Sequence, residues 1–517
     1  MRLTRERSLS QKITKNTIFN IIGRIWGVLA ILFLIPYIIR YVGTKGYGIW
    51  AIAGALVSYF GLLDFGLSEA FVKYISEFYA KKDYMKINKI ITSGFIFYFI
   101  TGVTVMSLFP FFIPFLIKCF HIPTDLYQEA WLVFLISFFT FVISYILSCF
   151  RVIQIGLQRM DITNKILIIT FILLISLTVY FLKSGFGLVG VAISSAIALV
   201  IGNTINVVVA FKLLPQLRLT PLLFDKSTFK EIFMFGYKLQ IARIATLIHF
   251  HLDKILLAYF LNLNFVTYYT VAAQLAFKIR EVPSLLVSAI FPATAELKAK
   301  EDRGRIMELY LRSIKYVLLA GLSIGGLGIL LARNFIFLWL GEGYQKSPLT
   351  LQILTIGYFF SVTASPAFFI LSGIGKPRYG MRASILSALS NLLFSIGLFF
   401  LIGYYGIPLG TAISMCIGSI YLVGMLNKLL RISFKELYLR LYVKPFLAFI
   451  GAFSGGYILM KFIILLTPTW FKLITIALIY MVIFLIIIFK INYLDAFDKN
   501  LIFRYSPIGS LRFIIRR

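Results

Sequence analysis

Long apolar segments recur along the whole chain, and they constrain its fold more than any other feature. A helix needs about 20 apolar residues to cross the roughly 30 Å hydrocarbon core of a bilayer. Hydrophobic residues make up 60% of the 517 positions, and charged residues make up only 14%. A soluble protein of this length would carry far more polar surface. The sequence therefore predicts an all-α integral membrane protein.

Every second segment between the apolar runs is rich in lysine and arginine. The predicted transmembrane helices, about 14 in number, are 15–38, 46–68, 89–117, 130–150, 164–182, 187–211, 232–260, 265–291, 312–332, 349–371, 381–402, 406–427, 444–466 and 470–490. Lysine or arginine follows every even-numbered span, as Lys81 and Lys82 follow the second and Lys298 and Lys300 the eighth. Cytoplasmic loops carry such a basic excess. We therefore expect a multi-pass protein of the plasma (inner) membrane with both termini in the cytoplasm.

The formal net charge of +31 is also typical of nucleic-acid-binding proteins. Here, however, most lysines and arginines lie at the two ends and in the predicted cytoplasmic loops. At these places they set the orientation and contact anionic lipid. We expect membrane lipid as a partner and no nucleic acid.

The sequence contains an internal repeat. Arg24 and Arg243 each lie inside a long apolar segment and are 219 positions apart (243 minus 24), and Gly156 and Gly375 share that offset. Because six spans is an even number, the second copy enters the membrane in the orientation of the first. The halves are then parallel repeats, and a substrate path is expected between them.

Four parts are predicted along the chain. They are an N-terminal six-helix lobe (1–215), a C-terminal six-helix lobe (216–432), two additional transmembrane helices (433–492) and a basic amphipathic cytoplasmic tail (493–517). Arginines of the tail alternate with Phe, Ile and Leu, a pattern typical of a segment that lies at the inner leaflet.

Cations inside the apolar segments are the candidates for a substrate site. Arg24 follows Lys15 by nine residues, which places it about 13 Å deep at 1.5 Å per residue. Asn16, Asn20 and Arg24 share one face of the first helix. A charge in hydrocarbon is costly and usually functional, and the arginine fork matches phosphate oxygens. The predicted cationic cavity comprises Arg24, Arg243, Lys254, Lys278, Arg280 and Asn20.

Other charged residues are candidates for ion coupling or gating. These are Asp64, Glu69, Lys73, Asp253 and Glu281. Structural ion pairs are an equally open interpretation, because Asp253 precedes Lys254 and Glu281 lies one helical turn from Lys278. Glu69, Lys73 and Glu77 are spaced by four, which is also typical of an ordinary helix surface.

Patterns typical of enzymes are absent from the sequence. It has no Gly-x-x-x-x-Gly-Lys-Ser/Thr phosphate loop. His249 and His251 diverge on a helix, and the three cysteines are far apart, so neither set has metal-ligand spacing. We expect a secondary transporter without a catalytic residue, cofactor or metal. Pairs such as Gly321/Gly325 and Gly406/Gly410 predict close helix packing.

Several motifs carry a family resemblance. They are Asn16-Thr-Ile-Phe-Asn20, Val42-Gly-Thr-Lys-Gly46-Tyr-Gly48, Asp64-Phe-Gly66-Leu, Lys73-Tyr-Ile-Ser-Glu77 and His251-Leu-Asp253-Lys-Ile-Leu-Leu-Ala-Tyr-Phe260. On these residues the whole chain resembles the polysaccharide (O-antigen-type) flippases of the multidrug/oligosaccharidyl-lipid/polysaccharide exporter superfamily. The motifs are loose, as is usual in a divergent family.

The resemblance implies two six-helix lobes in a V shape plus two C-terminal helices. It implies alternating access that moves polyprenyl-pyrophosphate-linked oligosaccharide from the cytoplasmic to the outer leaflet, for cell-surface polysaccharide such as the O-antigen of lipopolysaccharide. The driving force stays open between H⁺ or Na⁺ antiport through Asp253 or Glu281 and the membrane potential. A polysaccharide polymerase is a candidate partner.

Three alternative functions are weighed against this one. A peptidoglycan lipid-precursor flippase would carry the same lipid pyrophosphate. A drug/cation antiporter of the same superfamily would normally have twelve spans and an acidic cavity. A membrane glycosyltransferase or polymerase would need a large outward loop rich in carboxylates, whereas the longest predicted outward loops hold only Asp125, Glu129 and Glu342.

Overall fold

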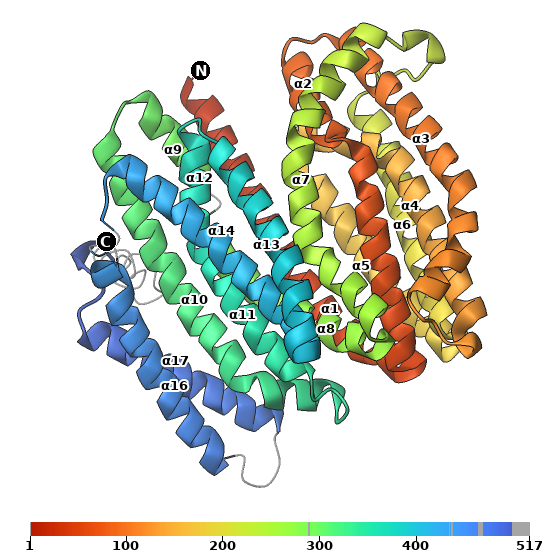
Figure 1. Ribbon diagram of the computed structural model, residues 1–517. Coiled ribbons are helices and arrows are strands. Elements are labelled where there is room, and N and C mark those ends of the chain that lie inside the picture. Colours follow the sequence, from red (N-terminus) through yellow and green to blue (C-terminus); the bar gives the residue numbers. More distant parts are fainter. Residues whose placement is uncertain (1, 288–289, 434, 436–437, 464–468, 499–517) are drawn as a thin grey trace, which may run out of the picture. The chain divides into compact units, whose positions relative to one another are not determined.

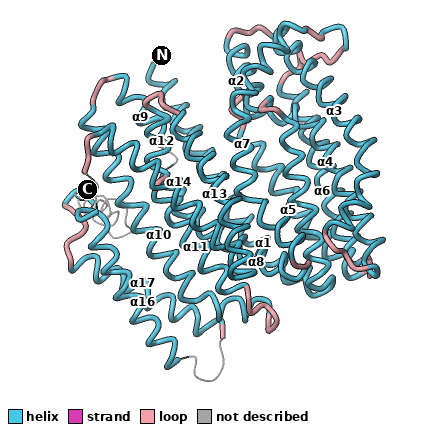
Figure 2. The backbone as a smooth tube through the Cα atoms, in the orientation of Figure 1, coloured by secondary structure: helices cyan, strands magenta, loops and turns pink. Residues whose placement is uncertain are grey.

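The computed structural model describes residues 2–287, 290–433, 435, 438–463 and 469–498. Backbone alone is described for residues 2–26, 28–30, 238–239, 241–246, 248–250, 291–292, 295, 299, 438, 440 and 463. All the regular elements in these ranges are helices, and the loops between them are short (Figure 2). The chain divides into two compact units, Met1–Val271 and Ala272–Arg517.

The first unit is a bundle of long helices. Its elements are α1 (Arg2–Phe60), η1 (Gly61–Asp64), α2 (Leu67–Ala80), α3 (Tyr84–Cys119), η2 (Thr124–Leu126), α4 (Tyr127–Gly156), α5 (Met160–Lys183), α6 (Gly187–Leu213), η3 (Pro221–Leu223), α7 (Lys226–Phe260) and the first part of α8 (Leu263–Ser284). Helix α4 packs against α3 and α6, and α5 packs against α6 and α1 (Figure 1). Phe71, Tyr98 and Phe150 belong to its buried core.

The second unit begins within α8 and is also helical. It continues with η4 (Leu285–Val287), α9 (Ile290–Ala299), α10 (Arg303–Leu340), α11 (Ser347–Thr363), α12 (Ser365–Gly373), α13 (Arg378–Ile402), η5 (Gly403–Tyr405), α14 (Gly406–Leu430), the π-helix η6 (Tyr438–Tyr442), α16 (Val443–Ile463) and α17 (Trp470–Lys490). Helices α16 and α17 pack against each other and against α10 (Figure 1).

The prediction of an all-α membrane protein is confirmed. Ten stretches of the described residues are long and apolar enough to cross a bilayer. Their bounds follow the predicted spans closely in places: α17 covers 470–490 as predicted, and α6 covers 187–213 against the predicted 187–211. The number of fourteen spans, the repeat and the four predicted parts stay predictions.

Several predicted spans have different boundaries in the structure. Spans 15–38 and 46–68 both fall within α1, which comprises two helices joined at a kink where Gly43 has a non-helical φ of 69° and ψ of 177°. The second span ends at Phe60, and left-handed residues Phe65 and Gly66 separate η1 from α2. Span 349–371 is divided at Ala364 into α11 and α12. In the predicted span 265–291, α8 ends at Ser284, one residue after Pro283, which has no backbone N–H to donate.

Two glycines hold the interrupted region of the first unit against α7. A Cβ atom on Gly66 would lie 2.3 Å from the carbonyl oxygen of Gly236. A Cβ atom on Gly236 would in turn lie 2.8 Å from the carbonyl carbon of Gly66. Because Gly66 also has φ 72°, only glycine satisfies both the backbone conformation and the close approach. Helix α2 therefore starts directly against α7.

The α13–α14 hairpin confirms the packing role predicted for Gly406 and Gly410. A Cβ atom on Gly406 would lie 2.3 Å from the backbone of Leu398, and one on Gly410 would lie 2.4 Å from the amide nitrogen of Ser395. Asn391 also donates a hydrogen bond to Thr411 across the pair at 2.8 Å. Small residues and interhelical hydrogen bonds are the usual means by which membrane helices associate.

Replacing Gly410 with alanine is expected to destabilise this hairpin. Its added methyl group meets backbone that cannot move aside, so we expect a loss of about 1–3 kcal/mol, typical of overpacking. Gly325→Ala is the matched control, because the nearest atom to its Cβ is a methyl carbon of Thr355 at an ordinary 3.6 Å. Thermal unfolding of the purified variants in detergent measures both effects. Equal melting temperatures for the two variants would contradict the packing account.

Candidate functional site

The central residues of the predicted cationic cavity lie partly outside the described side chains. Asn20 and Arg24 are in α1, and Arg243 is in α7. Their backbone is helical, as predicted, but the positions of their side chains are outside the description. Their contact with a substrate therefore stays a prediction. The other candidate residues are described, and they fall into four places.

Asp64 lies at the interruption between α1 and α2, buried in a network of hydroxyl groups. Its side chain is 5% exposed. The Tyr98 hydroxyl donates to its Oδ1 at 2.5 Å, and the Ser68 hydroxyl donates to the same oxygen at 2.8 Å. The Ser68 backbone N–H lies 3.4 Å from its Oδ2. These hydrogen bonds hold the Asp64 side chain at the interruption between the two helices.

The interruption also frees backbone carbonyl groups, and side chains of other helices bind them. Tyr145 of α4 donates to the carbonyl oxygen of Leu63 at 2.7 Å. Gln240 of α7 donates to that of Leu62 at 2.6 Å. Irregular backbone is tolerated at membrane depth only where protein or water satisfies it. Four helices of the first unit, α2, α3, α4 and α7, therefore converge with η1 on this polar centre.

Asp253 is the second buried carboxylate of the first unit. Its side chain is fully buried, and the Tyr269 hydroxyl of α8 donates to its Oδ2. His251, on the same helix, lies edge-on to Tyr59 of α1 with ring centroids 6.2 Å apart. Lys254 is half-buried and forms no ion pair among the described residues. Asp253 thus bonds a tyrosine of the next helix.

Lys278, Arg280 and Glu281 lie in the last turns of α8, in the second unit. Lys278 and Glu281 form an ion pair at 2.7 Å, as their spacing allowed. The Arg280 guanidinium lies over the ring of Tyr358, 5.4 Å from its centroid. Tyr358 belongs to α11, so Arg280 connects these two helices through a cation–π contact.

Glu69 and Lys73 lie on the exposed face of α2. The Lys73 ammonium contacts the rings of Tyr74 and Phe235, at 4.4 and 4.2 Å from their centroids. Glu77 forms its ion pair with Lys81 at 2.6 Å, and this hydrogen bond lowers the pKa of Glu77. The spacing of four thus places these residues on one surface, where Lys73 contacts aromatic rings.

A cluster of charges joins the segment after α17 to α10. Lys315 and Asp498 form a hydrogen-bonded ion pair, and Tyr316 donates to Asp498 at 2.5 Å. Arg312 lies 3.6 Å from the same carboxylate. Burial opposes the ionisation of Asp498, but hydrogen bonds from Lys315 and Tyr316 outweigh it and lower the pKa of this carboxyl group. The 183 positions between Lys315 and Asp498 left no signal of this pair in the sequence.

Asp498→Asn is expected to reduce stability by about 2 kcal/mol, the order of a hydrogen-bonded charge. Because the folded pKa lies below the usual 3.8, the contribution is complete above that value and is lost as the pH falls through the folded pKa. Melting temperature should therefore fall more steeply below about pH 4 in the native protein than in the variant. Glu308→Gln is the control, because the Glu308 side chain, which pairs with Arg312, is 58% exposed. Parallel pH profiles of native protein and Asp498→Asn would refute the claim.

Several residues of these centres were missed by sequence reasoning. Tyr98, Tyr145 and Gln240 bind the interrupted region from distant parts of the chain, and a tyrosine or glutamine in an apolar segment carries no spacing signal. The Asp64-Phe65-Gly66 sequence did offer a signal of the helix interruption, since aspartate and glycine favour turns. Within the described residues, no group of three or more His, Cys, Asp or Glu could hold a metal ion.

Similar proteins of known structure share this helical architecture. Lipid II flippase MurJ, in an inward closed conformation, matches with a TM-score of 0.74 and 17% identity, covering 92% of this chain and 98% of that protein. An inward-facing multidrug resistance MATE family transporter of the MOP superfamily matches with a TM-score of 0.63 and 17% identity, covering 80% and 95%. At these identities the matches establish the fold.

Sequence relatives connect this fold to surface polysaccharide. A putative O-antigen transporter of Shigella flexneri is 23% identical over 408 residues, which cover 78% of this chain and 94% of the relative. The family described as polysaccharide biosynthesis protein matches residues 13–298, more than half of the chain. The resemblance inferred from the motifs is confirmed. The chain belongs to the polysaccharide biosynthesis protein family and has the fold of the MOP-superfamily transporters.

Proposed function

We propose that the protein moves polyprenyl-pyrophosphate-linked oligosaccharide from the cytoplasmic to the outer leaflet of the plasma membrane. The observation that carries this proposal is the family match over residues 13–298, because it connects a transporter fold with polysaccharide biosynthesis. The relative from Shigella flexneri, by its name a putative O-antigen transporter, supports the same class of substrate.

The charges of the apolar segments support an anionic cargo. Arg24 and Arg243 lie within long apolar helices, and arginine binds phosphate oxygens with two parallel donors. Lys254 adds a half-buried cation without an ion pair among the described side chains. A drug/cation antiporter would need a negatively charged substrate site. The proposed substrate site is therefore cationic and binds the pyrophosphate group.

A transport assay in proteoliposomes tests the proposal. The purified protein is reconstituted with a polyprenyl-pyrophosphate-linked oligosaccharide, and an impermeant glycosidase is added outside. The glycosidase digests at once only the fraction of glycan that faces outward, so transport appears as a slow second phase that completes digestion. Protein-free vesicles should lack this phase. Equal time courses with and without the protein would contradict the proposed function.

A peptidoglycan lipid precursor is the second candidate cargo, and the fold match to the lipid II flippase favours it. The lipid pyrophosphate is common to both cargoes, and only the glycan differs. The same assay decides between them when each lipid is offered separately and then as a competitor. The cargo with the higher rate at equal concentration is the preferred one.

A further inference from the structure

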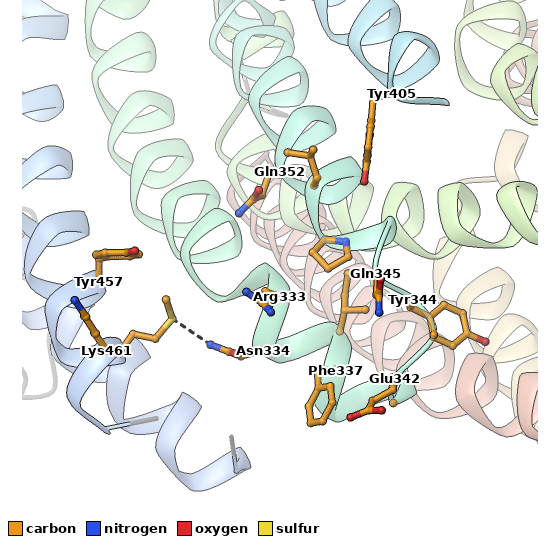
Figure 3. A pocket seen from close by; sticks show the side chains of 16 residues that line it. Arg333, Asn334, Phe337, Glu342, Tyr344, Gln345, Gln352, Tyr405, Tyr457 and Lys461 are labelled. Carbon is orange, nitrogen blue, oxygen red and sulfur yellow. Dashed lines mark hydrogen bonds between the residues drawn. The ribbon is translucent and has the colours of Figure 1, made fainter. Parts of the chain in front are cut away.

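A cavity of about 1080 Å³ opens in the second unit, and none of the candidate substrate or coupling residues lines it. Arg333 lines it from α10, Gln352 from α11, Tyr405 from η5, and Tyr457 and Lys461 from α16 (Figure 3). The loop between α10 and α11 closes another side. Five segments of the chain thus contribute side chains that can bind a polar ligand.

The cavity carries a net positive charge. Arg333 and Lys461 are both exposed and lie on neighbouring helices. Among the described residues that line the cavity, Glu342 is the only acid, and it forms no ion pair with either cation within 4.0 Å. Figure 3 shows Glu342 on the loop, on the side away from Lys461. Two cations against one carboxylate favour an anionic ligand.

A helix N-terminus and a third cation near the cavity strengthen its preference for an anionic ligand. Helix α11 begins at the cavity, where Pro348 and Leu349 of its first turn line the wall, and the N-terminus of a helix attracts anions. The Lys346 ammonium lies 5.2 Å from the ring centroid of Tyr405, which brings a third cation close to the wall. Asn334 of α10 donates to the sulfur of Met460 at 3.1 Å, so the two helices that carry Arg333 and Lys461 are in contact here.

Two tryptophans lie at helix ends of the second unit. Trp339 is the last residue but one of α10 and Trp470 is the first of α17, and both rings contact Phe335, at 5.9 and 5.6 Å between centroids. Tryptophan is enriched where the membrane meets water. Phe471 is 80% exposed beside Trp470, as expected for a side chain that faces acyl chains. These residues support a lipid environment beside the cavity.

We propose that this cavity binds the phosphate group of a lipid headgroup, with Arg333 and Lys461 as its principal ligands. The site uses none of the residues proposed to bind the substrate, and it stands on the geometry of the second unit alone. Two sources have this chemistry, a bulk anionic phospholipid and the phosphate end of a polyprenyl carrier lipid. In the predicted topology the loop between α10 and α11 faces outward, which places the site at the outer leaflet.

Lipid binding to the intact protein tests this site. The purified full-length protein is titrated with phosphatidylglycerol, with polyprenyl phosphate and with a phosphate-free diglucosyl-diacylglycerol, and bound lipid is counted by native mass spectrometry. The test variant is Arg333→Gln/Lys461→Gln. Its control, Lys118→Gln/Lys183→Gln, removes the same charge from exposed positions in the first unit. All these side chains are exposed, so each variant should elute as a monodisperse protein.

The test variant is expected to bind at least one phosphate lipid about tenfold more weakly than the control variant does. Weaker binding of phosphatidylglycerol would identify bulk phospholipid as the ligand, and weaker binding of polyprenyl phosphate alone would identify the carrier lipid. Affinity for the phosphate-free glycolipid should not change. The proposal is overturned if both variants bind both phosphate lipids with equal affinity, or if all three lipids are weakened alike.

Discussion

Arg24→Ala and Arg243→Ala are each expected to reduce transport of the lipid-linked oligosaccharide by about tenfold to a hundredfold. A hydrogen bond to a charged group contributes about 1.5–3 kcal/mol, and 1.4 kcal/mol is a factor of ten. The double variant should be at least as impaired as either single variant. Insertion should not suffer, because an arginine at the centre of a membrane helix opposes insertion. Initial rates in proteoliposomes at equal protein density measure the effect.

Arg40→Ala is the matched control for Arg24→Ala. Arg40 is an exposed arginine of the same helix, so its loss removes the same charge away from the proposed site. Arg24→Lys and Arg243→Lys separate the two-pronged contact from simple charge, because lysine is a point charge that donates from one atom. We expect partial activity in these variants. Normal transport by both alanine variants would contradict the proposed cationic substrate site.

Asp64→Ala is expected to give the largest loss of stability among single substitutions in the first unit, about 3 kcal/mol. It leaves the buried Tyr98 hydroxyl without its 2.5 Å partner, and a buried group deprived of its partner costs about 1–3 kcal/mol beyond the lost bond. Tyr98→Phe removes the donor instead and should cost about half as much. Thermal unfolding in detergent measures both. Glu77→Gln is the control, because its ion pair with Lys81 is exposed.

The Asp64→Asn variant distinguishes a structural role of Asp64 from a role in ion coupling. Asparagine keeps an oxygen that accepts from Tyr98 and Ser68, so this variant should fold. It cannot ionise, however, so a coupling role for Asp64 predicts transport that no longer responds to a pH gradient. A variant that transports normally and keeps the gradient response would restrict Asp64 to holding the interrupted helix. A melting temperature of Asp64→Ala equal to that of Glu77→Gln would contradict the structural role as well.

Properties that depend on local sequence were predictable. The apolar length of a helix and the loops at its ends set the bounds of α6 and α17, because both follow from composition along one segment. The spacing of four between Gly406 and Gly410 predicted a close contact between helices. Pro283 is a local signal for the end of α8, since proline cannot donate a backbone hydrogen bond to the helix.

Properties that depend on contacts between distant segments were not predictable. Asp64 was singled out as a charge, but its partner Tyr98 comes from another helix, as does Tyr145, which binds the carbonyl of the neighbouring Leu63. Neither tyrosine has distinguishing neighbours in the sequence. The ion pair of Lys315 with Asp498 forms only because the segment after α17 returns to α10.

The most direct test of the central claim compares two cargoes that differ in one group. The same oligosaccharide is attached to a polyprenyl chain through a pyrophosphate or through a neutral ether, and the translocation of each is measured in the same proteoliposomes. Binding of the pyrophosphate by intramembrane arginines predicts that the charged lipid moves at least about tenfold faster, and that Arg24→Ala/Arg243→Ala removes the difference. Equal rates for the two lipids in the native protein would contradict the account.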